Sequence, residues 1–116
     1  MQMTKAASIP VVRPIDDDPY QISTHTVTLT HTPIAVTPAT TVVLAANAAR
    51  KYLLLVNDSD TTIYVMFGAA AVLNQGIRIN ANGGSFCLEC TAISTGAINA
   101  IQGAAVNKNL LATEGV

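Results

Sequence analysis

The sequence has 116 residues, enough for one domain with a single core. Half of the residues are hydrophobic but only 11% are charged, against about 25% in an average soluble domain. The net charge of −1 argues against a nucleic-acid-binding surface, and no apolar run approaches the ~20 residues of a membrane-spanning helix. A surface so poor in charge is weakly hydrated, so we expect it to be covered in an assembly. The alternative is a monomer with a Thr- and Asn-rich coat.

Residues 1–20 differ in composition from the rest and are expected to form an extended N-terminal arm. They hold three of the five prolines and the acidic run 16–18. Proline fixes φ and removes a backbone donor, which argues against a helix or a central strand. The arm is either a solvated tail or a clasp that lies across a neighbouring subunit. For the clasp, the predicted inter-subunit contacts are Ile9, Val11, Val12, Ile15 and Tyr20.

Residues 21–116 carry the pattern of a single all-β domain. Short segments rich in β-branched residues alternate with turn signals, which predicts a β-sandwich or a jelly-roll-like domain of about eight short strands. Pro33 and Pro38 bracket a short piece and indicate an edge position or a corner. Ala69–Leu73 fits either a helical turn or a strand. The expected strands are 24–32, 41–45, 50–57, 61–68, 77–79, 86–89, 97–101 and 109–113.

The stretch 50–68 is the most informative part of the chain. Asn57-Asp58-Ser59-Asp60 lies between two apolar runs, and these residue types favour turns, so we expect a hairpin there. The nearly continuous run Leu53–Val56 is typical of a central strand that is covered on both faces. In the second strand, either Ile63, Val65 and Phe67 or else Tyr64 and Met66 face the core.

The candidate chemical sites have simpler structural interpretations. Cys87 and Cys90 form a CxxC pair, but a redox motif would open a helix, and a zinc site needs two more ligands. Asp58 and Asp60 suit a turn, and no glutamate follows at the position that a calcium loop requires. Ser59, Ser85 and Ser94 have no neighbouring base in the sequence. We therefore expect no enzyme activity, no metal and no cofactor, and structural cysteines.

Four blocks carry a resemblance to a protein family: RKYLLLVNDSDTTIYVMFG at 50–68, GIRINANGGSF at 76–86, GAINAI at 96–101 and NLLATE at 109–114. The blocks resemble small virion structural proteins of tailed bacteriophages, in which a strand precedes an N-x-S-D-x-x-I-Y-V-x-F-G segment. The resemblance covers about residues 50–114. It implies a β-sandwich that works by binding other virion proteins, as capsid decoration (cement) proteins, head-fibre bases and tail accessory proteins do.

The expected function is that of a phage capsid decoration protein, a homotrimer that binds the major capsid protein or another virion protein and stabilises the mature head. We expect it in the virion, assembled in the host cytoplasm, without nucleic-acid or membrane contacts, and the N-terminus lacks the features of a signal peptide. The alternatives are a head–tail or tail accessory protein and a head-fibre base. A carbohydrate-binding surface module is less favoured, because only Tyr20 is expected outside the core. The aromatic residues that we expect in the core are Tyr52, Tyr64, Phe67 and Phe86.

Overall fold

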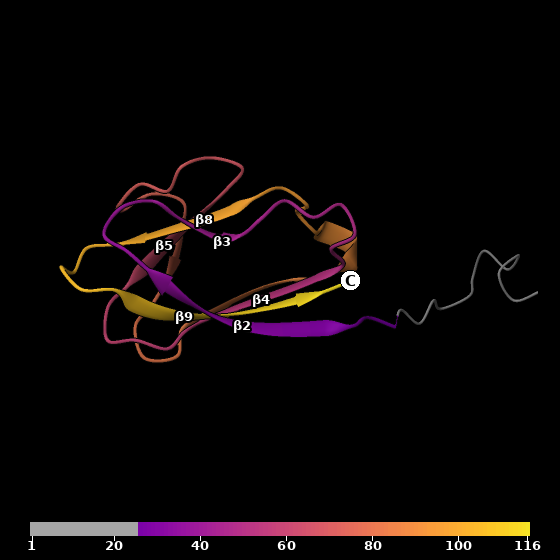
Figure 1. Cartoon of the computed structure of the whole chain (residues 1–116), viewed down its shortest axis with the longest axis horizontal. Coiled ribbons are helices and arrows are strands. Elements are labelled where there is room, and N and C mark those ends of the chain that lie inside the picture. Colours follow the sequence, from indigo (N-terminus) through magenta and orange to yellow (C-terminus); the bar gives the residue numbers. More distant parts are fainter. Residues whose placement is uncertain (1–25) are drawn as a thin grey trace, which may run out of the picture.

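The computed structural model describes residues 26–116, which fold into two antiparallel sheets of four strands each (Figure 1). The expected all-β sandwich is confirmed. The first sheet has the order β2-β9-β4-β7 and the second the order β3-β8-β5-β6. A three-residue 3₁₀ turn, η2 (Cys90–Ala92), follows β7. The strands are β2 (Leu29–Val36), β3 (Thr41–Leu44), β4 (Tyr52–Asn57), β5 (Ile63–Phe67), β6 (Ile77–Ile79), β7 (Ser85–Leu88), β8 (Ile98–Gln102) and β9 (Lys108–Gly115). The predicted arm, residues 1–20, lies outside the described residues.

The core lies between the two sheets and is made by alternate residues of each strand. In β4 the buried positions are Leu53 and Leu55, and in β5 they are Ile63 and Val65. This alternation follows from the period of two in a strand, in which successive side chains point to opposite faces. The complete buried cluster is Val36, Val43, Leu53, Leu55, Ile63, Val65, Ile79, Ile98, Ala100, Leu110 and Ala112.

The four aromatic residues expected in the core divide into two pairs. Phe67 and Phe86 pack against the buried cluster, with ring centroids 5.9 Å apart at an interplanar angle of 48°. Tyr52 and Tyr64 alternate with the buried residues of their strands and are only half-buried, on the outer faces of the two sheets. Their expected core positions are wrong because a strand's period alone does not say which of its faces meets the other sheet.

The predicted hairpin at Asn57–Asp60 is also wrong. β4 belongs to the first sheet and β5 to the second, so this turn carries the chain from one layer to the other. The buried Asn57 side chain sets this path. Its Nδ2 donates to the carbonyl oxygens of Thr61 and Ile79 at 2.8 and 3.0 Å, and its Oδ1 accepts from the Ser59 hydroxyl at 2.6 Å. The same residue types serve a hairpin and a sheet-crossing turn, so local chemistry does not distinguish them.

β2 runs without interruption through Pro33, where the sequence suggested a break. Pro33 pairs with Leu111 of β9, and β2 is an edge strand of the first sheet, as expected from the proline. Thr28 and Val116 exchange both backbone hydrogen bonds, at 2.8 and 3.1 Å. Since bonded and non-bonded pairs alternate in an antiparallel ladder, Pro33 falls in a non-bonded pair and its missing N–H costs no ladder bond.

Arg50 is the largest polar side chain in the interior and is 2% exposed. Its Nε donates to Glu114 Oε2 at 2.7 Å, in a salt bridge with the last strand. Its Nη1 donates to the carbonyl oxygens of Ser94 and Gly96 at 2.7 and 2.9 Å, and its Nη2 donates to that of Ala45 at 2.8 Å. The guanidinium therefore joins the β3–β4 and β7–β8 connections to β9. A buried charge needs such complete pairing to be tolerated.

We expect Arg50→Ala to lower the free energy of unfolding by about 3–5 kcal/mol, because it leaves Glu114 and three carbonyl oxygens without their partner. Arg50→Lys should lower the free energy of unfolding by less, since an ammonium group keeps the charge but does not reproduce the planar arrangement of donors. The matched control is Arg78→Ala. The Arg78 side chain is exposed and donates to Asn80, so its loss should change stability by under about 0.5 kcal/mol. Urea denaturation measures all three variants, and equal losses for Arg50→Ala and Arg78→Ala would contradict the assignment.

Candidate interaction surface

The outer face of the second sheet is partly covered by the chain itself, although Val42 of β3 is 61% exposed there. The connection between β5 and β6, residues 68–76, folds over this face (Figure 1). Asn99 Nδ2 donates to the Ala69 carbonyl oxygen at 2.7 Å, and the Tyr64 hydroxyl donates to Asn74 Oδ1 at 2.8 Å. Gly76 lies so close to the sheet that a Cβ there would be 2.8 Å from Met66 Sδ. Residues 69–73 form neither a helix nor a strand.

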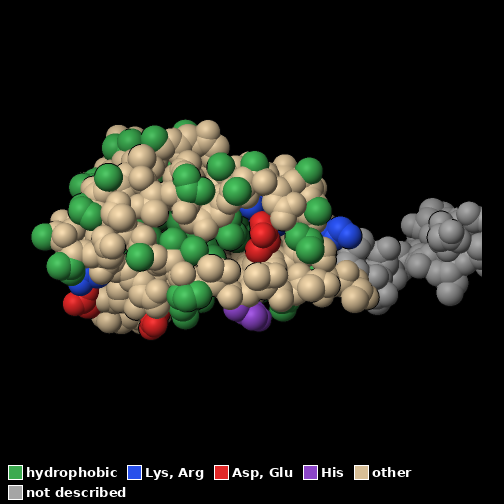
Figure 2. Space-filling view, in the orientation of Figure 1, with side chains coloured by type: hydrophobic (Ala, Val, Ile, Leu, Met, Phe, Trp, Pro, Cys, Tyr) green, Lys and Arg blue, Asp and Glu red, His purple; other side chains and the backbone are tan. Residues whose placement is uncertain are grey.

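No described segment covers the outer face of the first sheet in the same way. The strand pairings place thirteen residues on this face, none of them an acid, a lysine or an arginine. Charged side chains are also sparse across the visible surface in Figure 2. We call these residues the open face: Leu29, His31, Pro33, Ala35, Tyr52, Leu54, Val56, Ser85, Cys87, Asn109, Leu111, Thr113 and Gly115.

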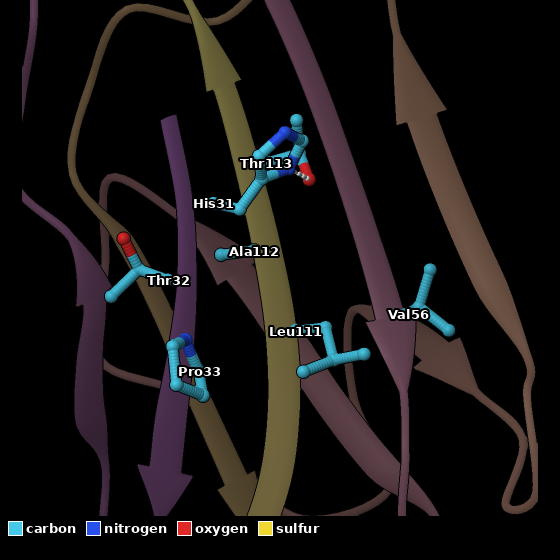
Figure 3. A pocket seen from close by; sticks show the side chains of 7 residues that line it. All are labelled: His31, Thr32, Pro33, Val56, Leu111, Ala112 and Thr113. Atoms are coloured by element: carbon cyan, nitrogen blue, oxygen red, sulfur yellow. Dashed lines mark hydrogen bonds between the residues drawn. The ribbon is translucent and has the colours of Figure 1, made fainter. Parts of the chain in front are cut away.

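The open face contains one hollow, of about 240 Å³. Figure 3 shows Val56, Leu111, Pro33 and His31 coming to it from three neighbouring strands, β4, β9 and β2. His31 Nδ1 and Thr113 Oγ1 are hydrogen-bonded at 2.9 Å across its upper side. The hollow is smaller than the ~300–1,000 Å³ of small-molecule sites. Its size suits side chains of a protein partner. The lining residues are His31, Thr32, Pro33, Val56, Leu111, Ala112 and Thr113.

One corner of the open face is closed by apolar side chains packed over a glycine. Gly115 is buried between Leu29 and Tyr52, its neighbours on β2 and β4. A Cβ at Gly115 would lie 2.9 Å from the Tyr52 Cβ and 3.1 Å from the Leu29 Cδ2. Leu29 is nevertheless 45% exposed, so the apolar surface extends from the hollow to the beginning of β2.

A tyrosine of β4 and a thiol of β7 meet on the open face. A side-chain hydrogen bond with the Cys87 thiol raises the pKa of Tyr52 above its ordinary value, and desolvation and the Glu89 carboxylate act in the same direction. Cys87 is exposed and is a free thiol. The ionisation of Tyr52 therefore moves further above neutral pH.

The predicted contact residues Ile9, Val11, Val12, Ile15 and Tyr20 lie outside the described residues, so they stay predictions. The open face was not among the predicted sites, although one signal pointed to it. The run Leu53–Val56 predicted a strand covered on both faces, and β4 is indeed central in its sheet. Leu53 and Leu55 are buried, whereas Leu54 and Val56 on the open face are only half-buried. The sequence predicts that both faces of β4 are covered, but residues 26–116 cover only the face that meets the second sheet.

The described residues hold no group of three or more His, Cys, Asp and Glu side chains that could bind a metal ion. Within the same part of the chain, no helix has the length and apolar character needed to cross a bilayer. Asp60 makes a salt bridge with Lys108 at 2.7 Å, which lowers the pKa of that carboxyl, and Asp58 accepts a hydrogen bond from Asn109. Both carboxylates thus have partners within the fold.

Adjacent leucines of β9 provide a test of which side of the first sheet is open. Leu110 is fully buried and Leu111 is 39% exposed. We expect Leu110→Asp to cost more than about 4 kcal/mol, because it places an unpaired charge in the core. Leu111→Asp should cost under about 1 kcal/mol, as surface substitutions do. Thermal unfolding followed by circular dichroism measures both, and a reversed order would show that the register is wrong.

The contact between Tyr52 and Cys87 predicts a specific titration shift. Because the thiol raises the pKa of Tyr52, removing it in Cys87→Ala should move the Tyr52 midpoint down towards the ordinary tyrosine value. The matched control is Ser85→Ala, on the same strand and the same face. Titration of ¹³Cζ-labelled tyrosine by NMR gives the midpoint, and an unchanged value in Cys87→Ala would rule out this contact.

Comparisons with protein-family models, with curated proteins and with solved structures found no match to this chain.

Proposed function

We propose that this chain is a tailed-phage capsid decoration protein, which stabilises the mature head through protein–protein contacts. The observation that carries the proposal is the open face. The fold covers part of one outer face with its own residues 68–76 and leaves the other uncovered, largely apolar and without an acid, a lysine or an arginine. Contiguous apolar surface of this kind marks protein interaction sites in soluble proteins. The sequence blocks at 50–114 that resemble virion structural proteins include β4 and β9, which form the centre of this face.

The mechanism is stabilisation by linkage. A protein that binds the mature shell and not its separated subunits shifts the equilibrium towards the shell. No covalent step or cofactor is needed. The partner is the major capsid protein or another virion protein, and a homotrimer of the chain would place three open faces around one axis.

The test uses heads of the source phage assembled without this protein. We expect the purified chain to bind them saturably in co-sedimentation and to raise the temperature at which they rupture. Leu111→Asp should reduce binding, because it places a charge on the open face. Val106→Asp should bind normally, since Val106 is 64% exposed on the β8–β9 connection. Absence of saturable binding to the heads would overturn the proposal.

The mass in solution separates the related virion roles. Light scattering coupled to size exclusion should give a trimer near three times 12.0 kDa. A six- or twelve-membered ring would instead indicate the head–tail or tail accessory role. A trimer that binds a fibre protein and not the shell would indicate a head-fibre base, and binding to an oligosaccharide array would indicate a carbohydrate-binding module.

A further inference from the structure

The dimensions of the open face suit a narrow partner. Four strands about 4.8 Å apart and the eight residues of β2 at ~3.3 Å each give a face of roughly 20 by 26 Å. This footprint is about two-thirds of the ~800 Å² that each partner contributes to a standard protein–protein interface. A second copy laid face to face would therefore make a contact below the standard size, whereas an extended peptide segment matches the length of the face.

The edge beside the open face is poorly suited to strand addition. Thr28 and Val116 form a hydrogen-bonded pair, and bonded and non-bonded pairs alternate from there along the ladder. The backbone N–H and C=O groups of the non-bonded residues point to the free edge of β2. These residues are Leu29, His31, Pro33 and Ala35. Pro33 has no N–H, so the middle of this edge lacks a donor. Proline at such a position is a known means of blocking edge-to-edge pairing. A partner should therefore pack onto the face, with its side chains in the hollow.

One segment of the chain has the matching properties. In Ile9-Pro10-Val11-Val12-Arg13-Pro14-Ile15, the residues Ile9, Val11 and Ile15 share one side of an extended conformation. At ~3.3 Å per residue the segment spans about 23 Å, close to the length of the face. Its two prolines lack backbone donors, so the segment also suits side-chain packing better than a hydrogen-bonded ladder.

The proposed function favours a face on another copy, because copies that decorate one head lie beside one another. β2 runs from Leu29 at the Tyr52 corner towards Val36, and the hollow at Pro33 lies further along this direction.

We propose that the open face of each copy receives residues 9–15 of a neighbouring copy, with aliphatic side chains in the hollow between β2, β9 and β4. The inference rests on the proposed function and deepens it, because exchanged segments link the copies that decorate one head. Such links gain strength from effective concentration, since each copy is already held beside its neighbour.

Disulfide trapping between two distinguishable full-length chains tests the exchange. One chain carries Val56→Cys in the hollow as its only cysteine, through Cys87→Ser and Cys90→Ser. The other carries Cys87→Ser and Cys90→Ser together with Ile9→Cys, Val11→Cys or Ile15→Cys. After mixing and mild oxidation, mass spectrometry identifies the peptide that joins the two introduced cysteines. A disulfide needs Cβ atoms about 3.5–4.5 Å apart, so it reports direct contact with the face.

We expect at least one of the three positions to cross-link roughly a hundred times faster than the control Thr4→Cys, a gain within the range that tethering gives. Leu111→Asp in the receiving chain should reduce the rate to the control level while its melting temperature falls by no more than about 8 °C. Rates equal to the control at all three positions would overturn the proposal. So would cross-links that form only within a monomer when both cysteines are on one chain.

The outcome can be separated from that of the proposed function. Cross-linking is measured on the free protein, and head binding is measured by co-sedimentation. Cross-links without binding to heads would remove the decoration role and keep the exchange. Binding to heads without cross-links would keep the decoration role and remove the exchange.

Discussion

The sandwich depends on polar side chains buried where the chain passes between its two sheets. Three such residues are fully or almost fully buried: Arg50, Asn57 and Gln102. Arg50 joins two sheet-crossing connections to the last strand, and Asn57 holds the β4–β5 turn. Gln102 donates to the carbonyl oxygens of Val36 and Val106 and accepts from the Ala104 N–H, where β8 leads to β9. Each satisfies backbone groups that an apolar interior would otherwise leave unpaired, at a cost of about 1–3 kcal/mol per group.

This arrangement explains how a small domain with few aromatics can leave one sheet face uncovered. The crossings are fixed by hydrogen bonds at both ends of the sandwich, so the apolar residues of the inner faces meet without help from an outer layer. The connection 68–76 then packs over the second sheet. The first sheet keeps Leu54, Val56 and Leu111 outside the core. These side chains lie outside the interior, and the proposed contact with a partner would give their apolar character a role.

Strand positions followed from the sequence because alternation is local, whereas the pairing of strands did not. Each of the eight expected strands overlaps an observed one, although Pro33 lies inside β2 and Ala69–Leu73 lies in a connection. The residues of the turn at Asn57 suit both a hairpin and a crossing between sheets, and only distant carbonyl groups such as that of Ile79 decide between them. The open face needed the register between β2, β9 and β4, which no single strand contains. The one local signal is the apolar run of β4. It predicts that both faces of this strand are covered, whereas residues 26–116 cover only one of them.

The charge distribution of the open face also bears on the kind of contact it makes. Charged groups across an interface accelerate encounter and make binding sensitive to salt. The open face has no acid, lysine or arginine, and the Cys87 thiol raises the pKa of Tyr52. Association through this face therefore gains no electrostatic steering, and the strength of the contact must come from slow dissociation of packed apolar groups. Slow dissociation suits a protein that stays in place after assembly better than one that exchanges partners rapidly. The physics of the face thus agrees with a permanent structural role.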